Sequence, residues 1–157
     1  MPIRVYLVQH AEAKPKEEDP ERHLTERGVE EAHKLAGYVE KTLQIKVNRI
    51  IHSTKTRARQ TAEILAEHVK PEKGIQEEKD LEPLADPSIW AKKLNELEED
   101  VIIVGHLPHL SKLVSTLICG NPEIEIVKFR YSNMVCLERD DEGKWRILWI
   151  LRPDIIP

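Results

Sequence analysis

Histidine and arginine side chains occur at three places in this sequence where an apolar segment has just ended. The residues are His10, Arg57 and His106, and the segments are residues 3–8, 47–52 and 101–104. An imidazole nitrogen can attack phosphorus and hold it as a phosphohistidine, which divides one hard step into two. A guanidinium can grip two phosphate oxygens at once, and a protonated imidazole is another charged donor. These residue types therefore indicate phosphoryl transfer.

The three apolar segments have the composition of buried β-strands. Strands of an α/β sheet place functional groups outside their carboxyl ends, so we expect the three polar groups to meet at one edge of the sheet. Helices are expected after Thr25, Thr54 and Asp86, and from Pro108. The last third predicts three antiparallel strands, at residues 124–130, 134–139 and 145–151. The predicted fold class is therefore α/β, a three-layer α/β/α arrangement with a mainly parallel sheet and an antiparallel C-terminal flank.

Length and composition limit the kinds of protein that this chain can be. A chain of 157 residues predicts one domain spanning residues 1–157. The formal net charge of −4 argues against general nucleic-acid binding, which needs a dense basic face. Two cysteines provide neither a disulfide framework nor a metal quartet, and we expect no metal and no cofactor. No leader is evident and no apolar run approaches the ~18 residues of a membrane span, so we expect a soluble cytoplasmic protein without a membrane partner.

His106 and His109 are close enough in the sequence to resemble a pair of metal ligands. Pro108 and the absence of a nearby carboxylate or cysteine set argue against a zinc site formed by His106 and His109. The histidines that we interpret as surface or helix residues are His23, His33, His52 and His68.

Four motifs give the sequence a family resemblance. They are VYLVQHAEA at residues 5–13, RHLTERG at 22–28, STKTRARQTA at 53–62 and VGHLP at 104–108. The first and last resemble the Arg-His-Gly strand and the second-histidine motif of the histidine phosphatase superfamily, which has the phosphoglycerate mutase-like fold. The middle two resemble its Arg-Pro-Leu-Thr-x-x-Gly and Ser-Pro-x-x-Arg-Ala-x-Gln-Thr-Ala segments. The order and content are similar to those of the short bacterial SixA-type phosphohistidine phosphatases.

The resemblance implies a role for each matching residue. His10 takes the position of the nucleophile, and Arg57 and His106 take the positions that bind the phosphoryl group. Arg22 is implied as an additional contact, because the SixA group has an arginine there. The predicted site therefore combines one attacking imidazole with several phosphate-binding donors.

Two further positions depart from the family pattern or match it loosely. Gln9 occupies the position of a phosphate-binding arginine, and its amide can donate a hydrogen bond but brings no charge. Charged hydrogen bonds contribute ~1.5–3 kcal/mol against ~1 for neutral ones, so the change alone predicts transfer slowed by roughly ten-fold or more. Glu82 is the best positional match for the glutamate that larger relatives use as a proton donor.

The resemblance implies a metal-independent phosphohistidine phosphatase that acts on a phosphorylated protein through a covalent phosphohistidine intermediate. The reactive P–N bond of such a substrate needs little general-acid help, and the short chain lacks room for a large lid. One alternative is a phosphatase for small phosphomonoesters, which would need Glu82. Another is a catalytically weak module that binds phosphate or a phosphoprotein, which the replacement at Gln9 would explain. The sequence leaves the oligomeric state open.

Overall fold

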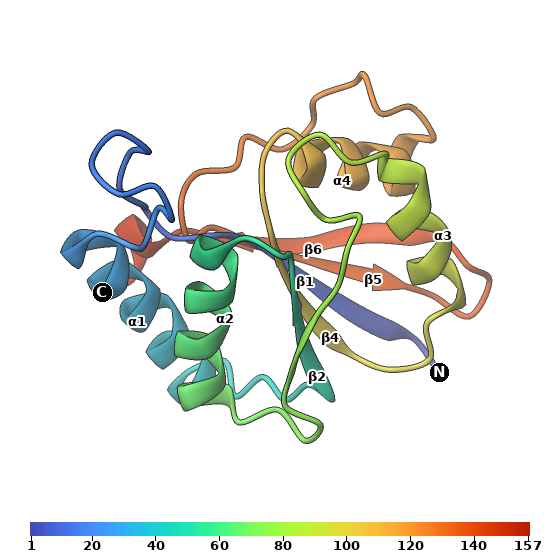
Figure 1. Ribbon diagram of the computed structural model, residues 1–157. Coiled ribbons are helices and arrows are strands. Elements are labelled where there is room, and N and C mark those ends of the chain that lie inside the picture. The colour runs from blue at the N-terminus through green and yellow to red at the C-terminus, as the bar shows by residue number, and fades with distance from the viewer.

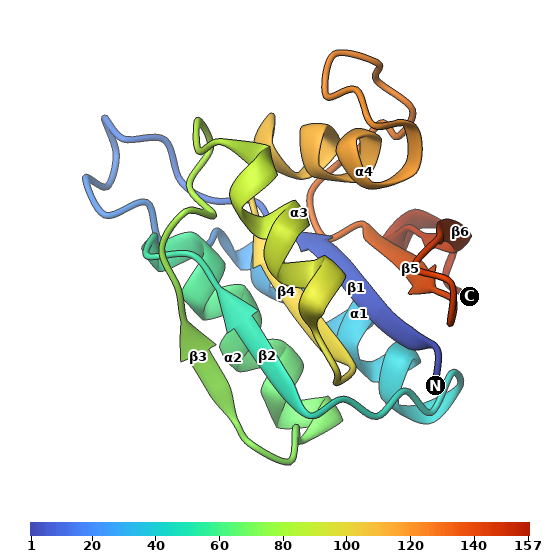
Figure 2. The ribbon, with the colours of Figure 1, turned by 90° about the vertical axis from the view of Figure 1, so that its right-hand side faces the viewer.

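A mixed six-stranded sheet forms the centre of the protein, and the computed structural model describes residues 1–157. Its strands are β1 (Ile3–Gln9), β2 (Arg49–His52), β3 (Ile75–Glu77), β4 (Val101–Gly105), β5 (Met134–Arg139) and β6 (Trp145–Leu151). They lie in the order β3-β2-β4-β1-β5-β6 (Figure 2). The first four in this order are parallel, whereas β5 and β6 are antiparallel to their neighbours. This confirms the mainly parallel sheet with an antiparallel C-terminal flank.

Helices cover both faces of the sheet (Figure 1). They are α1 (Glu26–Lys41), α2 (Thr56–Val69), α3 (Pro87–Glu96) and α4 (His109–Cys119), with a short 3-10 helix at Pro153–Ile155. Leu35 of α1 and Leu65 of α2 share one buried cluster, and Leu94 of α3 and Leu113 of α4 share the other. The three-layer arrangement is therefore confirmed. None of these helices has the length and apolar character needed to cross a membrane.

Strand β1 is buried on both sides, as expected for the interior of an α/β sheet. Tyr6 and Val8 pack into the cluster beneath α1 and α2, whereas Val5 and Leu7 pack into the cluster beneath α3 and α4. Successive side chains of a strand point to opposite faces, so one apolar run supplies both cores. This packing holds the end of β1, and hence His10, in a fixed place.

Local signals set several helix ends where the sequence predicts them. The Thr25 side chain accepts a hydrogen bond from the Gly28 amide and caps α1. Asp86 caps α3 in the same way through the Ser88 amide. Gly120 ends α4 in the left-handed conformation that glycine adopts without steric cost. Helix α2 is an exception, because it begins at Thr56 without a side-chain cap.

The predicted strand at residues 124–130 is wrong, because this part of the chain has no strand structure. Val127 and Phe129 are buried and alternate with exposed neighbours, which is the pattern that predicts a strand. However, β5 already pairs with β1 on one side and with β6 on the other. No sheet edge beside β5 is left to pair with this segment, which instead packs against α4, where Ser115 Oγ donates to the Ile124 carbonyl.

Candidate active site

Two histidines meet at the carboxyl end of the sheet because β1 and β4 are adjacent and parallel. Gln9 and Gly105 are opposite each other in this pair, so His10 and His106 follow at the same edge. The His10 amide donates to the Gly105 carbonyl at 3.0 Å. The centroids of the two imidazole rings lie 5.0 Å apart. Both side chains are buried, with relative exposures of 6% for His10 and 1% for His106.

The hydrogen bonding of His10 defines which ring nitrogen is free. Its Nδ1 lies 2.7 Å from the Ala11 carbonyl oxygen, which can only accept, so Nδ1 carries the proton and donates. The lone pair is then on Nε2. Burial lowers the pKa of His10 to about 4, although the bond to Ala11 opposes this shift. The ring is therefore neutral near pH 7, and its Nε2 can act as a nucleophile.

The first two turns of α2 hold the backbone after His10, and the backbone at Leu24, in place. Thr61 Oγ1 accepts a hydrogen bond from the Ala11 amide at 2.9 Å and donates to the Arg57 carbonyl at 2.8 Å. The Gln60 side chain accepts from the Leu24 amide at 2.8 Å. The glutamine and threonine of the RARQTA segment therefore connect the loops that carry His10 and Arg22 to one helix.

Close packing against α1 fixes the same loop from the other side. The Thr25 amide donates to the Glu12 carbonyl at 3.0 Å. A Cβ atom added at Gly28 would lie 2.2 Å from that carbonyl oxygen, which no side chain could tolerate. The glycine of the RHLTERG segment is thus required for a close approach between the first turn of α1 and the histidine loop.

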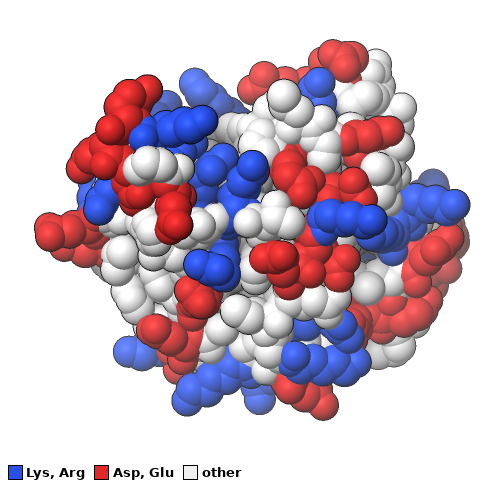
Figure 3. All heavy atoms as spheres, viewed as in Figure 1, with Lys and Arg blue, Asp and Glu red and all other residues white.

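Two guanidinium groups face His10 without an acidic partner. The charges of Arg57 and Arg22 both lower the pKa of His10, and the charge of Arg22 adds to burial in lowering the pKa of Arg57. Arg57 Nε is buried and has no hydrogen-bond partner, while Arg22 Nε donates only to the Lys14 carbonyl at 2.9 Å. Lys and Arg side chains also gather near the start of α2 (Figure 3). Unpaired cations around a buried neutral imidazole form an anion-binding site.

His106 reaches this site from β4 and is positioned by Ser53, which follows β2. Its Nε2 lies 2.6 Å from Ser53 Oγ, and its buried Nδ1 has no protein partner. Burial, together with the charges of His10 and Arg57, lowers the pKa of His106 well below its ordinary value. The ring is therefore neutral in the free protein. The charged donor that a protonated imidazole would supply is absent until an anion binds. An anion bound beside Nδ1 would favour the protonated form.

The side chain of Gln9 is buried at the end of β1, with 7% of its surface exposed. Its Oε1 has no hydrogen-bond partner, and neither does Oγ of the neighbouring buried Ser132. The backbone of Gln9 is held by the segment before β5, since its carbonyl accepts from the Ser132 amide at 3.0 Å. Gln9 lacks the positive charge of the arginine that the family has at this position, and no cationic side chain forms a hydrogen bond with the Gln9 side chain.

Glu82 contacts the third motif, at Thr54. Its carboxylate accepts from Thr54 Oγ1 at 3.3 Å, and its charge raises the pKa of the buried His109, which burial lowers overall. Its charge is not among those that shift the pKa of His10. The structure therefore brings Arg22, Arg57 and His106 around His10 and holds Glu82 at Thr54.

Tyr131 is a site residue that the sequence did not identify. Its ring centroid lies 5.6 Å from that of His10, and the tyrosine is 41% exposed. A hollow of about 640 Å³ begins at this tyrosine. It is lined by Glu12, Arg27, Glu31, Lys128, Arg130, Tyr131, Asn133, Arg152, Pro153 and Asp154. Tyr131 belongs to none of the four motifs. It directly follows residues 124–130, which the sequence predicted to be a strand of the C-terminal flank and not part of the site.

A family model confirms the resemblance. The model described as histidine phosphatase superfamily (branch 1) matches residues 5–84, which is about half of the chain. The chain belongs to this superfamily. As a histidine phosphatase it is a hydrolase that acts on phosphoryl groups through a histidine nucleophile. The matched region contains His10, Arg22, Arg57 and Glu82, whereas His106 lies beyond it.

Solved structures of histidine phosphatases have the same fold. The protein histidine phosphatase SixA, solved with tungstate, has a TM-score of 0.87 at 24% identity, covering 98% of this chain and 99% of that chain. A putative SixA phosphohistidine phosphatase from Agrobacterium tumefaciens has a TM-score of 0.76 at 26% identity, with the same coverage. A putative alpha-ribazole-5′-P phosphatase from Escherichia coli has a TM-score of 0.79 at 14% identity, covering 96% of each chain. The search of curated proteins finds no match.

Proposed function

We propose that this histidine phosphatase removes the phosphoryl group from a phosphohistidine side chain of another protein, with His10 as the nucleophile. The observation that carries this proposal is the pairing of a free Nε2 on His10 with two unpaired guanidinium groups beside it. The Ala11 carbonyl holds the proton on Nδ1, and the charges of Arg22 and Arg57 both reach the ring. A dianionic phosphoryl group is the ligand that neutralises this arrangement.

In the first step, His10 Nε2 attacks phosphorus and forms a new N–P bond. The P–N bond to the substrate imidazole breaks, and the departing ring takes up a proton from solvent. Arg57 and Arg22 stabilise the negative charge on the equatorial oxygens. The Ser53 hydroxyl can donate to His106 Nε2 at 2.6 Å, which leaves an Nδ1 proton for a phosphoryl oxygen.

In the second step, a water molecule attacks the phosphorus held on His10. The bond to Nε2 breaks, inorganic phosphate leaves, and the ring returns to its neutral form with the proton on Nδ1. The ring keeps one orientation through both steps, because its Nδ1 donates to the Ala11 carbonyl and the Ala11 amide donates to Thr61 Oγ1. The protein groups thus supply position and charge, and the two displacements divide the reaction.

The proposed substrate class rests on the leaving group and on the surroundings of the site. An imidazole leaves easily once protonated, so the reaction does not need an acid beside His10. A hollow lined mostly by charged side chains begins at Tyr131, whose ring lies beside His10, and it offers polar contacts to a protein that carries the phosphohistidine. The likeness to the two SixA structures supports the same class.

Glu82 favours a second candidate, a phosphatase for small phosphomonoesters. Its carboxylate is held by Thr54 Oγ1, one residue from the Ser53 that contacts His106. A rotation of this side chain toward His10 would bring a proton donor to an alkoxide leaving group. Solved structures with this fold include a phosphoserine phosphatase from Entamoeba histolytica, at 13% identity and a TM-score of 0.71.

A substrate panel with variants at Glu82 and His10 tests both candidates. A histidine-phosphorylated protein should be hydrolysed much faster than phosphoserine or 3-phosphoglycerate, and Glu82→Gln should leave that rate nearly unchanged. Denaturing the enzyme during turnover should trap an acid-labile phosphoryl group that is absent in His10→Ala. Faster turnover of a small ester with a strong dependence on Glu82 would establish the second candidate instead. Full activity of His10→Ala would refute the mechanism in both cases.

A further inference from the structure

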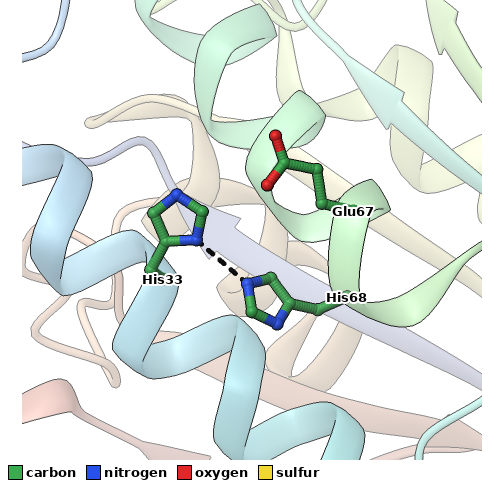
Figure 4. Close-up of side chains that lie close together, drawn as sticks. All are labelled: His33, Glu67 and His68. Carbon is green, nitrogen blue, oxygen red and sulfur yellow. Dashed lines mark hydrogen bonds between the residues drawn. The ribbon is translucent and has the colours of Figure 1, made fainter.

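Two histidines that the phosphatase site does not use lie against each other between α1 and α2. His33 comes from α1 and His68 from the last turn of α2 (Figure 4). His33 Nδ1 is 2.9 Å from His68 Nε2, and the rings meet edge to face with centroids 5.2 Å apart. Neither imidazole is fully buried, so an ion in solution can reach both rings.

A carboxylate completes a set of three potential ligands. A carboxylate oxygen of Glu67, the exposed residue before His68, lies within 4.8 Å of a ring nitrogen of each histidine. Two imidazoles and one carboxylate form the donor set of a zinc site with three protein ligands and an open position for water. We propose that His33, His68 and Glu67 form a Zn²⁺ site that joins α1 to α2.

The nitrogen positions require only a small adjustment to hold the ion. Two nitrogens at zinc bond lengths in a tetrahedral site are separated by about 3.3 Å. The present 2.9 Å separation of His33 Nδ1 and His68 Nε2 is slightly shorter. The rings would move apart by a few tenths of an ångström and turn so that both lone pairs point at the ion, while the exposed Glu67 side chain would swing inward.

A fourth residue prepares His68 as a ligand. Glu40 Oε1 of α1 lies 3.3 Å from His68 Nδ1, which places the proton on Nδ1 and the lone pair on Nε2. Such a carboxylate behind a histidine ligand fixes the tautomer and raises the basicity of the ligating nitrogen. Without metal, His33 Nδ1 donates to His68 Nε2. If the His33 proton moves from Nδ1 to Nε2 of the same ring, His33 Nδ1 becomes free to bind the ion, and the ring stays neutral. Glu40 is therefore a positioning residue of the proposed site.

The choice of Zn²⁺ follows from the types of ligand. Imidazole nitrogens select transition-metal ions, whereas Mg²⁺ and Ca²⁺ prefer oxygen ligands throughout. The ion would tie the middle of α1 to the end of α2, the two helices that hold the His10 loop through Thr25 and Thr61. Because the ligands come together only in the folded chain, bound metal stabilises the fold. This site is independent of the proposed phosphatase mechanism.

Calorimetric titration of the full chain, freed of metal by chelation, tests the proposal with ZnCl₂ as the probe. One Zn²⁺ should bind per chain, and Mg²⁺ should not compete. A 100-fold excess of zinc over Kd should raise Tm by about 5–10 °C, and EDTA should reverse the shift. His68→Gln and His33→Gln should lose the shift, and Glu40→Gln should weaken binding by about 10–100-fold.

Matched variants distinguish this site from others that could chelate zinc. Glu67→Gln should weaken zinc binding, whereas Glu63→Gln, an exposed glutamate one turn earlier on α2, should bind zinc as the unaltered chain does. None of these variants should change phosphatase activity without metal. The proposal is overturned if the chain does not bind zinc. It is equally overturned if His33→Gln and His68→Gln bind zinc normally, or if binding is lost only in His10→Ala.

Discussion

Replacing Thr61 with valine should loosen the loop that carries His10, the proposed nucleophile. The Thr61 hydroxyl is fully buried, and it accepts from the Ala11 amide at 2.9 Å while donating to the Arg57 carbonyl. Valine has the same shape but can neither accept nor donate. The Ala11 amide would then be a buried donor without a partner, which costs about 1–3 kcal/mol. The free energy of unfolding, measured by urea denaturation, should fall by that amount.

The same substitution should lower activity, because Ala11 also supplies the carbonyl that holds the His10 proton on Nδ1. If half of the lost energy appears in the transition state, kcat/KM should fall by roughly two- to thirteen-fold. Thr116→Val is a matched control, since Thr116 makes the same back-bond to its own helix, to the Lys112 carbonyl at 2.7 Å, but accepts from no loop amide. Equal losses in the two variants, or unchanged activity in Thr61→Val, would refute this account of the loop.

Two further predictions follow from the charges of the site. Because burial lowers the pKa of His10 from its ordinary 6.5 to about 4, kcat/KM should persist well below neutral pH and fall only as the pH nears that lower value. The unfolded chain takes up this proton first, so the free energy of unfolding should decrease as the pH falls between these two values, and His10→Gln should reduce the slope. A slope unchanged in that variant would contradict the assignment. Gln9→Arg should raise kcat/KM about ten-fold by restoring a charged donor. An equal or lower rate would show that the site is adapted to the amide.

Local signals in the sequence were sufficient for most elements of the fold. Thr25 and Asp86 predicted helix starts correctly because a cap depends on contacts within a few residues. Residues 124–130 were predicted wrongly because their alternation of apolar and polar residues is a local property, whereas a strand also needs a free neighbouring edge. The pairing of β5 with both β1 and β6 leaves no edge beside it, and its pairing with β1 joins segments that are far apart in the sequence.

The candidate site also combines residues that the sequence predicted with features that depend on contacts in the folded chain. The motifs predicted His10, Arg57 and His106, because nucleophile and phosphate ligands are chosen by chemical type. They did not predict Tyr131, which reaches the His10 ring from an irregular segment. The neutral state of His106 was also beyond the sequence, since its pKa depends on burial and on the charges around it.

The sequence by itself determined the family, the strand ends that carry the histidines and the residue types for phosphoryl transfer. Only the tertiary structure decided which nitrogen of His10 is free, because that depends on the distance from Nδ1 to the Ala11 carbonyl. It also decided that Arg22 and Arg57 stay unpaired beside this ring, and that His33 meets His68 across two helices. The physical reason is common to all three: hydrogen bonding and electrostatic interaction depend on separation in space, which the order of residues along a chain does not contain.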